Sequence, residues 1–517
     1  MSAGIGTPGS LLWFARFEAR LAWRDALSMM TAGRLGRQRK LALGLVTFLL
    51  FLHLVAYLVL RFVEGAVRPD LPTFVVVTAG IAISGSAMLA QAMETVTRTF
   101  YTRSDLELIL SAPVEPSGLF VVRIAAMALS ASGMSILVMG PFINVLAWRG
   151  GPQWLGGYGV LVAVAIASTG VAVALTMLLF KVLGPARTRL VAQISAAVVG
   201  GIFVIGLQVS AMLSLGTMSR FVFLTSPYFL SHVPGIDSVF WYPARAAMGD
   251  GYSLALVLGG SVLLFAGVTA RYAPRFADYA LTASSRAHEA ERRQPAAARE
   301  FRVEPASAAL RSKERRLLLR DPWLISQSLM QLLYLIPPGV LLWGSLGRGS
   351  AASIVLVPVL IMTAGQLAGG LAWLTISGED APDLVLSAPI TPSRLLRAKI
   401  EVVMQCVGMV LLPFVGLLAL ISPVQALVVA FGSAAAAASS TAIQLWFRSQ
   451  SKRSHFRRRH TSSRIATFSE ALVSITWAAA GAVTAISMTF AAIVALIALA
   501  ILASVRAFSP TRAARNT

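Results

Sequence analysis

The residue types that most often carry out chemistry are scarce in this chain of 517 residues. Its single cysteine, Cys406, lies inside an apolar run, which excludes a disulfide framework and a cysteine metal site. No GxSxG or HExxH signature occurs. The five histidines are scattered, at His53, His232, His288, His455 and His460. We therefore predict no catalytic residue, no bound metal and no cofactor.

His53 is the only histidine in the middle of a long apolar run, and a histidine at membrane depth is a candidate proton relay. No acidic residue is spaced to pair with it along a helix, so we expect His53 to be a packing residue. Glu64 and Arg123 are expected at other depths, and the three are not expected to form an ion-coupling set. The chain also lacks GxxxxGK[ST], the loop that cradles nucleotide phosphates.

Composition then limits the class of protein. Hydrophobic residues make up 56% of the chain and charged residues 13%, about half of the roughly 25% that is usual in soluble domains. The 44 basic and 22 acidic residues give a net charge of +22. Because the basic residues gather between apolar runs, they indicate membrane topology, and no nucleic-acid partner is expected.

A spanning helix needs about 20 mostly apolar residues. Twelve such segments are predicted, and the last two form a hairpin with a turn near Met488. They are 41–60, 72–93, 119–148, 157–180, 190–213, 252–272, 324–343, 351–376, 395–419, 424–446 and the hairpin 471–507.

The basic segments fix the expected orientation. Residues 1–40, 181–189, 271–320 and 448–464 are all basic, and threading twelve spans from an inside N-terminus puts all four in the cytoplasm. We expect a multi-pass protein of a bacterial inner (plasma) membrane with both termini cytoplasmic. The intervening segment 216–250 is then external, and its aromatic residues predict either an interfacial belt or a structured gate.

An internal repeat divides the chain. Leu108–Pro116 reads LILSAPVEP and Leu384–Pro392 reads LVLSAPITP, with six of nine positions identical at an offset of 276. Upstream, Glu18–Asp25 reads EARLAWRD and Glu314–Asp321 reads ERRLLLRD, at an offset of 296. The predicted organisation is two pseudo-symmetric six-span units, 1–272 and 311–517, joined by a cytoplasmic linker over 273–310.

Each unit opens with a basic amphipathic segment. Arginines spaced by four residues form one cationic stripe on a helix, with apolar residues on another face. Such a helix lies in the membrane interface among lipid headgroups; the alternative is a solvated helix that leads into a span. The arginines are Arg16, Arg20 and Arg24 in the first unit and Arg316 and Arg320 in the second.

A Ser-Ala-Pro segment follows the second span of each unit. Acidic residues open it, apolar residues follow and a proline ends it, which predicts a short helix with exposed leucines. Those leucines must pack against a partner protein or, alternatively, against the protein's own spans or the membrane interface. Thr391 and Pro392 are typical of an N-cap and first helical residue. The segment residues are Asp105, Glu107, Leu108, Leu110, Ser111, Ala112 and Pro113, and Asp383, Leu384, Leu386, Ser387, Ala388 and Pro389.

The repeated Ser-Ala-Pro segment, the Arg-Asp motif before each first span and the six-span units resemble type-2 ABC exporter permeases. The resemblance covers most of the chain, on short motifs. It implies that the amphipathic segments are elbow helices and that Asp105–Pro113 and Glu379–Pro389 are coupling helices. Coupling helices dock on an ATP-binding subunit, so the resemblance also implies two copies of a separate ATPase, an exported substrate and no enzyme activity on this chain. Arg123 and Lys399, just after the segments, are expected to snorkel to the interface.

Two other functions compete with this interpretation. A secondary transporter also uses repeats but usually needs charge near the bilayer midplane, and few acids lie there. A membrane enzyme acting on lipid-linked substrates would need clustered acids or histidines at one membrane face, and no DDxxD cluster occurs. The permease is the leading hypothesis.

Overall fold

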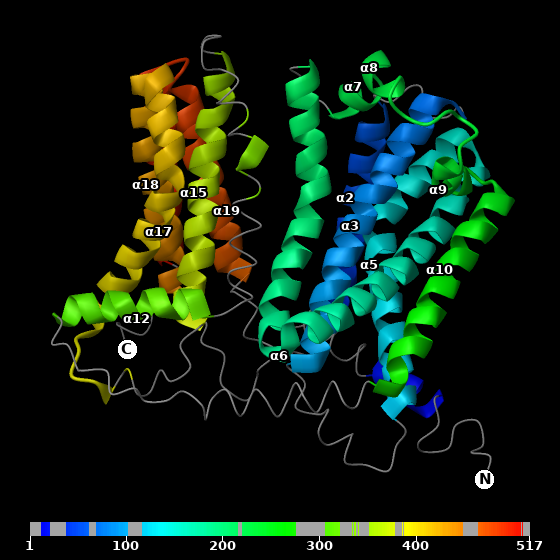
Figure 1. Cartoon of the computed structure of the whole chain (residues 1–517). Helices are drawn as coiled ribbons and strands as arrows, with labels where there is room; N and C mark the ends of the chain where they lie inside the picture. The colour runs from blue at the N-terminus through cyan, green and yellow to red at the C-terminus, as the bar shows by residue number, and fades with distance from the viewer. Residues whose placement is uncertain are drawn as a thin grey trace. The chain divides into compact units, whose positions relative to one another are not determined.

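The computed structural model describes residues 12–20, 38–61, 69–101, 116–215, 220–275, 305–320, 351–377, 387–447 and 464–507, with isolated residues between 333 and 340 and at 385 and 509. Every regular element in these ranges is a helix (Figure 1). Nine of these helices are long and apolar enough to cross a membrane. The protein is therefore an all-α polytopic membrane protein, as predicted from its apolar runs.

The chain divides into two compact units, Met1–Pro295 and Ala296–Thr517. The first unit contains the helical segment 12–20 and five long helices. These are α2 (Gln38–Arg61), α3 (Leu71–Tyr101), α5 (Pro116–Gly150), α6 (Gly156–Leu215) and α10 (Gly251–Tyr272), with short η2 (Pro152–Leu155) and η4 (Ala273–Arg275).

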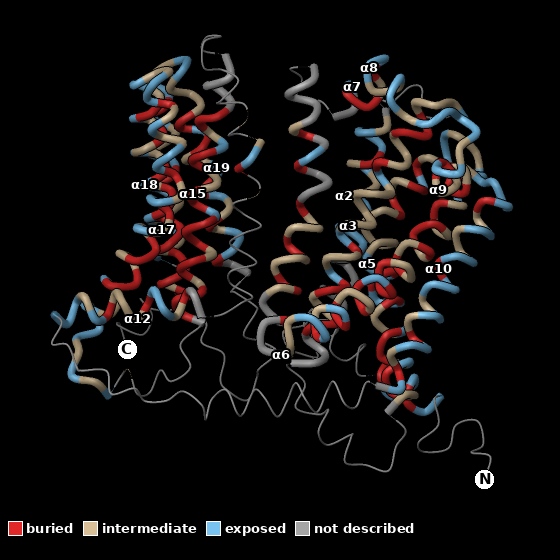
Figure 2. The backbone as a smooth tube through the Cα atoms, viewed as in Figure 1, coloured by how far each residue is buried: buried red, intermediate tan, exposed pale blue. Residues whose placement is uncertain are grey.

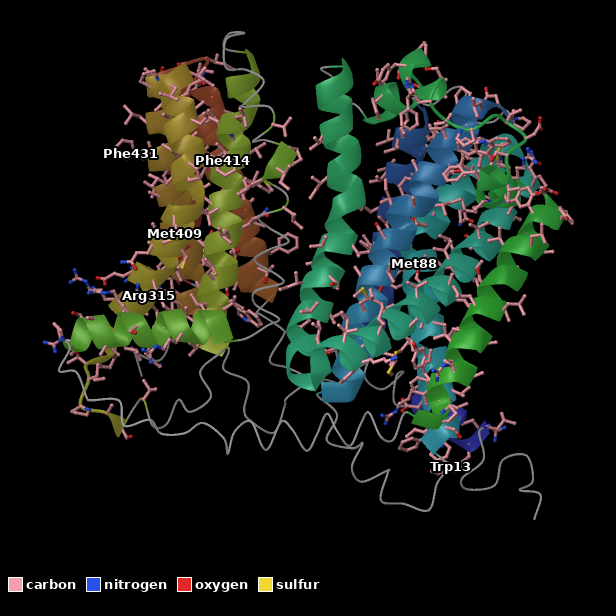
Figure 3. All side chains as sticks on the ribbon, in the orientation of Figure 1. Trp13, Met88, Arg315, Met409, Phe414 and Phe431 are labelled. Carbon is pink, nitrogen blue, oxygen red and sulfur yellow. The ribbon has the colours of Figure 1, made fainter. Side chains whose placement is uncertain are left out.

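Helix α6 carries the fourth and fifth predicted spans. Gly184 interrupts it with φ 70° and ψ 167°, and a positive φ of this size is readily adopted only by glycine. A sharp kink thus replaces the expected basic loop, and the helix resumes beyond it (Figure 1). Buried residues gather where α3 packs against α6 (Figure 2), and Met88 of α3 lies inside this core (Figure 3).

The segment 216–250 forms a small structured cap from residue 220 onward. It contains α7 (Arg220–Leu224), α8 (Pro227–Leu230), η3 (Val239–Trp241) and α9 (Tyr242–Ala247). Trp241 is buried and stacks on Phe74 of α3 with ring centroids 6.3 Å apart, and its indole N–H donates to the Gly235 carbonyl at 3.0 Å. Tyr228 and Phe240 are exposed, so only part of the aromatic set anchors the cap to the bundle.

The second unit contains α12 (Ala306–Arg320), α15 (Ala351–Ser377), α17 (Pro392–Ile421), α18 (Pro423–Trp446), α19 (Arg464–Val483) and α20 (Met488–Ala507). Figure 1 shows α12 lying across the ends of the upright helices of this unit. The predicted terminal hairpin is confirmed, with its turn at 484–487, although α19 begins at Arg464 rather than at 471.

The count of twelve spans stays a prediction. The predicted span 324–343 lies largely outside the described residues. Two further predicted spans, in α2 and in the second part of α6, contribute apolar stretches of Val46–Leu60 and Val191–Gly201, which are shorter than the other nine.

Candidate functional site

The amphipathic helix α12 buries one face made of Leu310, Glu314 and Leu318, which are spaced by four residues. Arg315 and Arg316 are exposed, and Figure 3 shows Arg315 on this helix beside α17. The amphipathic character predicted from the sequence is confirmed for α12. Its last residue is Arg320.

The helical segment 12–20 of the first unit repeats this pattern. Phe14 and Glu18 are buried, at the positions that match Leu310 and Glu314 at the offset of 296. Arg16 and Arg20 are exposed, as the predicted cationic stripe requires. Arg24, the third arginine of that stripe, lies outside the described residues.

Each buried glutamate forms an ion pair with the helix that follows the Ser-Ala-Pro segment. In the first unit Arg123 Nε of α5 donates to Glu18 Oε1 at 3.2 Å, with side chains 3% and 10% exposed. In the second unit Lys399 Nζ of α17 donates to Glu314 Oε2 at 2.9 Å, with side chains 10% and 0% exposed. The expectation that Arg123 and Lys399 snorkel is therefore wrong: a glutamate on the amphipathic helix of each unit supplies the counter-charge that lets the cation stay buried.

Glu18 and Glu314 were not among the site residues predicted from the sequence, unlike the arginines of the same motifs. A signal was present. Glu18 and Glu314 stand four residues after the apolar Phe14 and Leu310, so each acid lies within the apolar face of its helix. The bases Arg123 and Lys399 repeat at the other offset, 276 residues apart.

Lys399 also forms a hydrogen bond to a third helix, α15. Its ammonium group also donates to the carbonyl of Thr375, in the last turn of α15. The Ser-Ala-Pro segment of this unit connects α15 to α17 in sequence. The Lys399–Thr375 hydrogen bond joins the same two helices directly. Lys313, a neighbour on α12, adds a longer contact of 3.3 Å to Glu314 Oε1.

A second, more exposed contact joins the same two helices. Arg311 of α12 donates to Glu401 of α17 at 2.9 Å, and Arg397 donates to the other oxygen of Glu401 at 2.8 Å. The Arg311 and Glu401 side chains are 32% and 30% exposed. Exposed pairs of this kind contribute about 0–1 kcal/mol, whereas removing one partner of a buried pair costs about 3–5 kcal/mol.

The Ser-Ala-Pro segments themselves are described only at their end. The first, with Asp105, Glu107, Leu108, Leu110, Ser111, Ala112 and Pro113, and the acidic and leucine part of the second, with Asp383, Leu384 and Leu386, lie outside the described residues. Ser387 and Pro389 are exposed, Ala388 is half-buried, and Thr391 and Pro392 are the N-cap and first residue of α17, as predicted. In the first unit Pro116, which matches Pro392, begins α5.

His53 takes part in a series of hydrogen bonds that links α2, α5 and α6. Its Nδ1 lies 2.8 Å from the Leu49 carbonyl, which only accepts, so Nδ1 carries the proton. Its Nε2 then accepts from the Asn144 amide at 3.2 Å, and Asn144 Oδ1 accepts from the Tyr158 hydroxyl at 2.8 Å. Both ring nitrogens of His53 are therefore engaged in hydrogen bonds to neighbouring groups, which fits a packing role.

We expect His53→Ala to reduce the free energy of unfolding of the first unit by only about 1 kcal/mol, the usual net value of one hydrogen bond. SDS-induced unfolding of the purified protein in detergent measures this change. Tyr158→Phe is the matched control, because it removes the donor at the other end of the series, and a similar change is expected. A much larger loss in His53→Ala than in Tyr158→Phe would contradict the packing role.

The second unit contains a buried polar cluster where α15, α18 and α19 pack together. The cluster has two layers, one helical turn apart. In one layer the Ser440 and Ser474 hydroxyls are 3.1 Å apart, beside Gly365. In the other, Gln444 donates to the Glu470 carboxylate at 2.6 Å, beside Gly369. The predicted close packing at the GxxxG pair is confirmed. Glu470 was not singled out from the sequence, although its spacing of four from Ser474 matches that of Ser440 from Gln444.

Among the described residues no group of three or more histidine, cysteine, aspartate or glutamate side chains is placed to hold a metal ion. These elements define the class: a polytopic α-helical membrane protein whose two units each pin an amphipathic helix to a span by a buried ion pair. No family model, curated protein or solved structure matches the chain.

Proposed function

We propose that this chain is the membrane-spanning permease subunit of an ATP-driven exporter of the ABC type. Two copies of a separate ATP-binding subunit would dock on its Ser-Ala-Pro segments, and the two units would alternate between inward and outward openings. The protein would lie in a bacterial inner membrane with both termini cytoplasmic. ATP hydrolysis is assigned to the partner because this sequence has no phosphate-binding loop.

One observation carries the proposal. Both units have the same order of elbow helix, spans, Ser-Ala-Pro segment and next span, and in both a buried ion pair joins the elbow helix to the helix after that segment. The exposure of Ser387 and Pro389 supports the docking role, because a partner needs an accessible segment. The repeat supports two docking positions on one chain.

The proposal is tested by purifying the protein from its native membranes in mild detergent. We expect an ATP-binding protein with a GxxxxGK[ST] motif to co-purify at two copies per chain, and the complex to hydrolyse ATP. A chain of similar hydropathy from the same membranes is the control for non-specific capture. Recovery of the intact chain without an ATPase would contradict the proposal.

A second candidate function, an ion-coupled transporter, is favoured by Glu470. This carboxylate is buried at the junction of three apolar helices, and acids inside membrane spans often bind coupling ions. The candidate ranks second because Glu470 is a single site in one unit, whereas the ion pairs and the Ser-Ala-Pro segments occur in both. Transport that persists without ATP and is lost in Glu470→Gln would favour it.

A further inference from the structure

A buried ion pair attaches the elbow helix of each unit to a span. In the second unit Glu314, Lys399 and Thr375 bring α12, α17 and the end of α15 together, and we call these three residues the elbow joint. Glu314 has no exposed surface, and Lys399 is nearly buried. In the first unit Glu18 and Arg123 occupy the matching repeat positions and are also buried.

The position of the elbow joint relative to the Ser-Ala-Pro segment is specific. Helix α15 ends at Ser377 and α17 begins at Pro392, so the segment is the connection between them. Thr375 lies two residues before the end of α15 and Lys399 seven residues after the start of α17, and their hydrogen bond joins the two helices near this connection. Lys399 thus links the end of α15 and the first part of α17 to Glu314 on α12.

A buried ion pair suits this task better than apolar packing alone. Apolar helix faces can slide along one another with small changes in buried area. A buried charge that loses its partner is strongly destabilised, so the pair fixes one register of α12 against α17. Leu310 and Leu318, on either side of Glu314, contribute buried apolar surface to the contact. The ion pair determines where α12 lies along α17.

We propose that Glu18–Arg123 and Glu314–Lys399 are positioning residues that make each elbow helix move as one body with the span that follows the Ser-Ala-Pro segment. This inference rests on the proposed function, since an ATP-binding subunit supplies the movement. It adds a specific role for two acid–base pairs that the resemblance to exporters does not assign.

The test measures the distance between α12 and α17 by electron paramagnetic resonance. Spin labels are attached to cysteines at Ser307 and Met409, two exposed positions, in a background without Cys406. The complex with its ATP-binding subunit is measured without nucleotide and with ATP trapped by vanadate. In the unaltered protein we expect the same distance in both states, because the joint holds the two helices together.

Breaking the joint should make this distance depend on nucleotide. Glu314→Gln should give a shift between the two states, and Lys399→Met a larger one, because it also releases Thr375. The exchange Glu314→Lys with Lys399→Glu should restore a constant distance. Arg311→Gln is the matched control, because it removes the exposed contact between the same two helices, and it should leave the distance constant.

The outcomes separate the inference from the proposed function. A retained ATPase with the same distance in both states for Glu314→Gln and Lys399→Met would overturn the positioning role and leave the exporter proposal standing. A distance that broadens equally in both states would also overturn it, since that is the effect of a purely structural pair. Failure of the unaltered chain to retain an ATPase would overturn both.

Discussion

Leu108→Asp and Leu384→Asp should each release the ATP-binding subunit from a chain that still inserts normally. Both leucines follow the acidic residues of a Ser-Ala-Pro segment and precede its proline, where an apolar anchor is expected. Interface energy concentrates in a few desolvated apolar contacts. A charge in such a groove costs on the order of 3 kcal/mol, which is about a 100-fold loss of affinity. The measurement is the amount of ATPase that co-purifies, together with ATP-driven transport.

The double variant should be worse than either single one, because two separate docking positions fail. Ser393→Asp is the control: it adds the same charge at an exposed position in the first turn of α17, where an acid is favourable. It should retain the ATPase. If both leucine variants also keep the ATPase and full activity, the Ser-Ala-Pro segments are not the docking sites and the exporter proposal loses its main support.

Periodicity and length alone predicted most of the helices, because a membrane span must satisfy its own backbone and so needs a long apolar run. The start of α17 at Thr391–Pro392 and the turn before Met488 were also predictable, since N-cap, proline and hairpin signals are local. The kink at Gly184 was not predicted, because a basic stretch between two spans normally indicates a loop.

The ion pairs could not be predicted in the same way, because their partners are distant in sequence. Glu18 and Arg123 are separated by 105 residues, and Glu314 and Lys399 by 85. A single sequence shows only that an acid lies on an apolar helix face and that a base lies near the end of a span. The tertiary contact that satisfies both is a property of packing. The sequence does show that both charges are repeated: the acid recurs at an offset of 296 residues and the base at an offset of 276.

The GxxxG pair of α15, Gly365 and Gly369, predicted only part of the packing that the structure shows. Its spacing predicted close helix packing but not the neighbouring helix or its chemistry. In the structure α19 approaches so closely that a Cβ at Gly365 would overlap the Ser474 hydroxyl, and one at Gly369 would overlap the Glu470 carboxylate. The two glycines thus make room for a buried hydroxyl and a buried acid.

Gly369→Ala should therefore destabilise the second unit by about 2–6 kcal/mol. Overpacking costs about 1–3 kcal/mol, and displacing the Glu470 carboxylate from Gln444 leaves a buried polar group without its partner, which costs about 1–3 kcal/mol more. SDS-induced unfolding in detergent measures the loss.

Gly408→Ala in α17 is the control, because nothing lies within 4 Å of its added Cβ, and it should be neutral or stabilising. Combining Gly369→Ala with Glu470→Ala removes the overlapping group, so the double variant should be more stable than the sum of the two single losses predicts. Additive losses, or equal effects at Gly369 and Gly408, would show that α15 and α19 are not packed through this glycine.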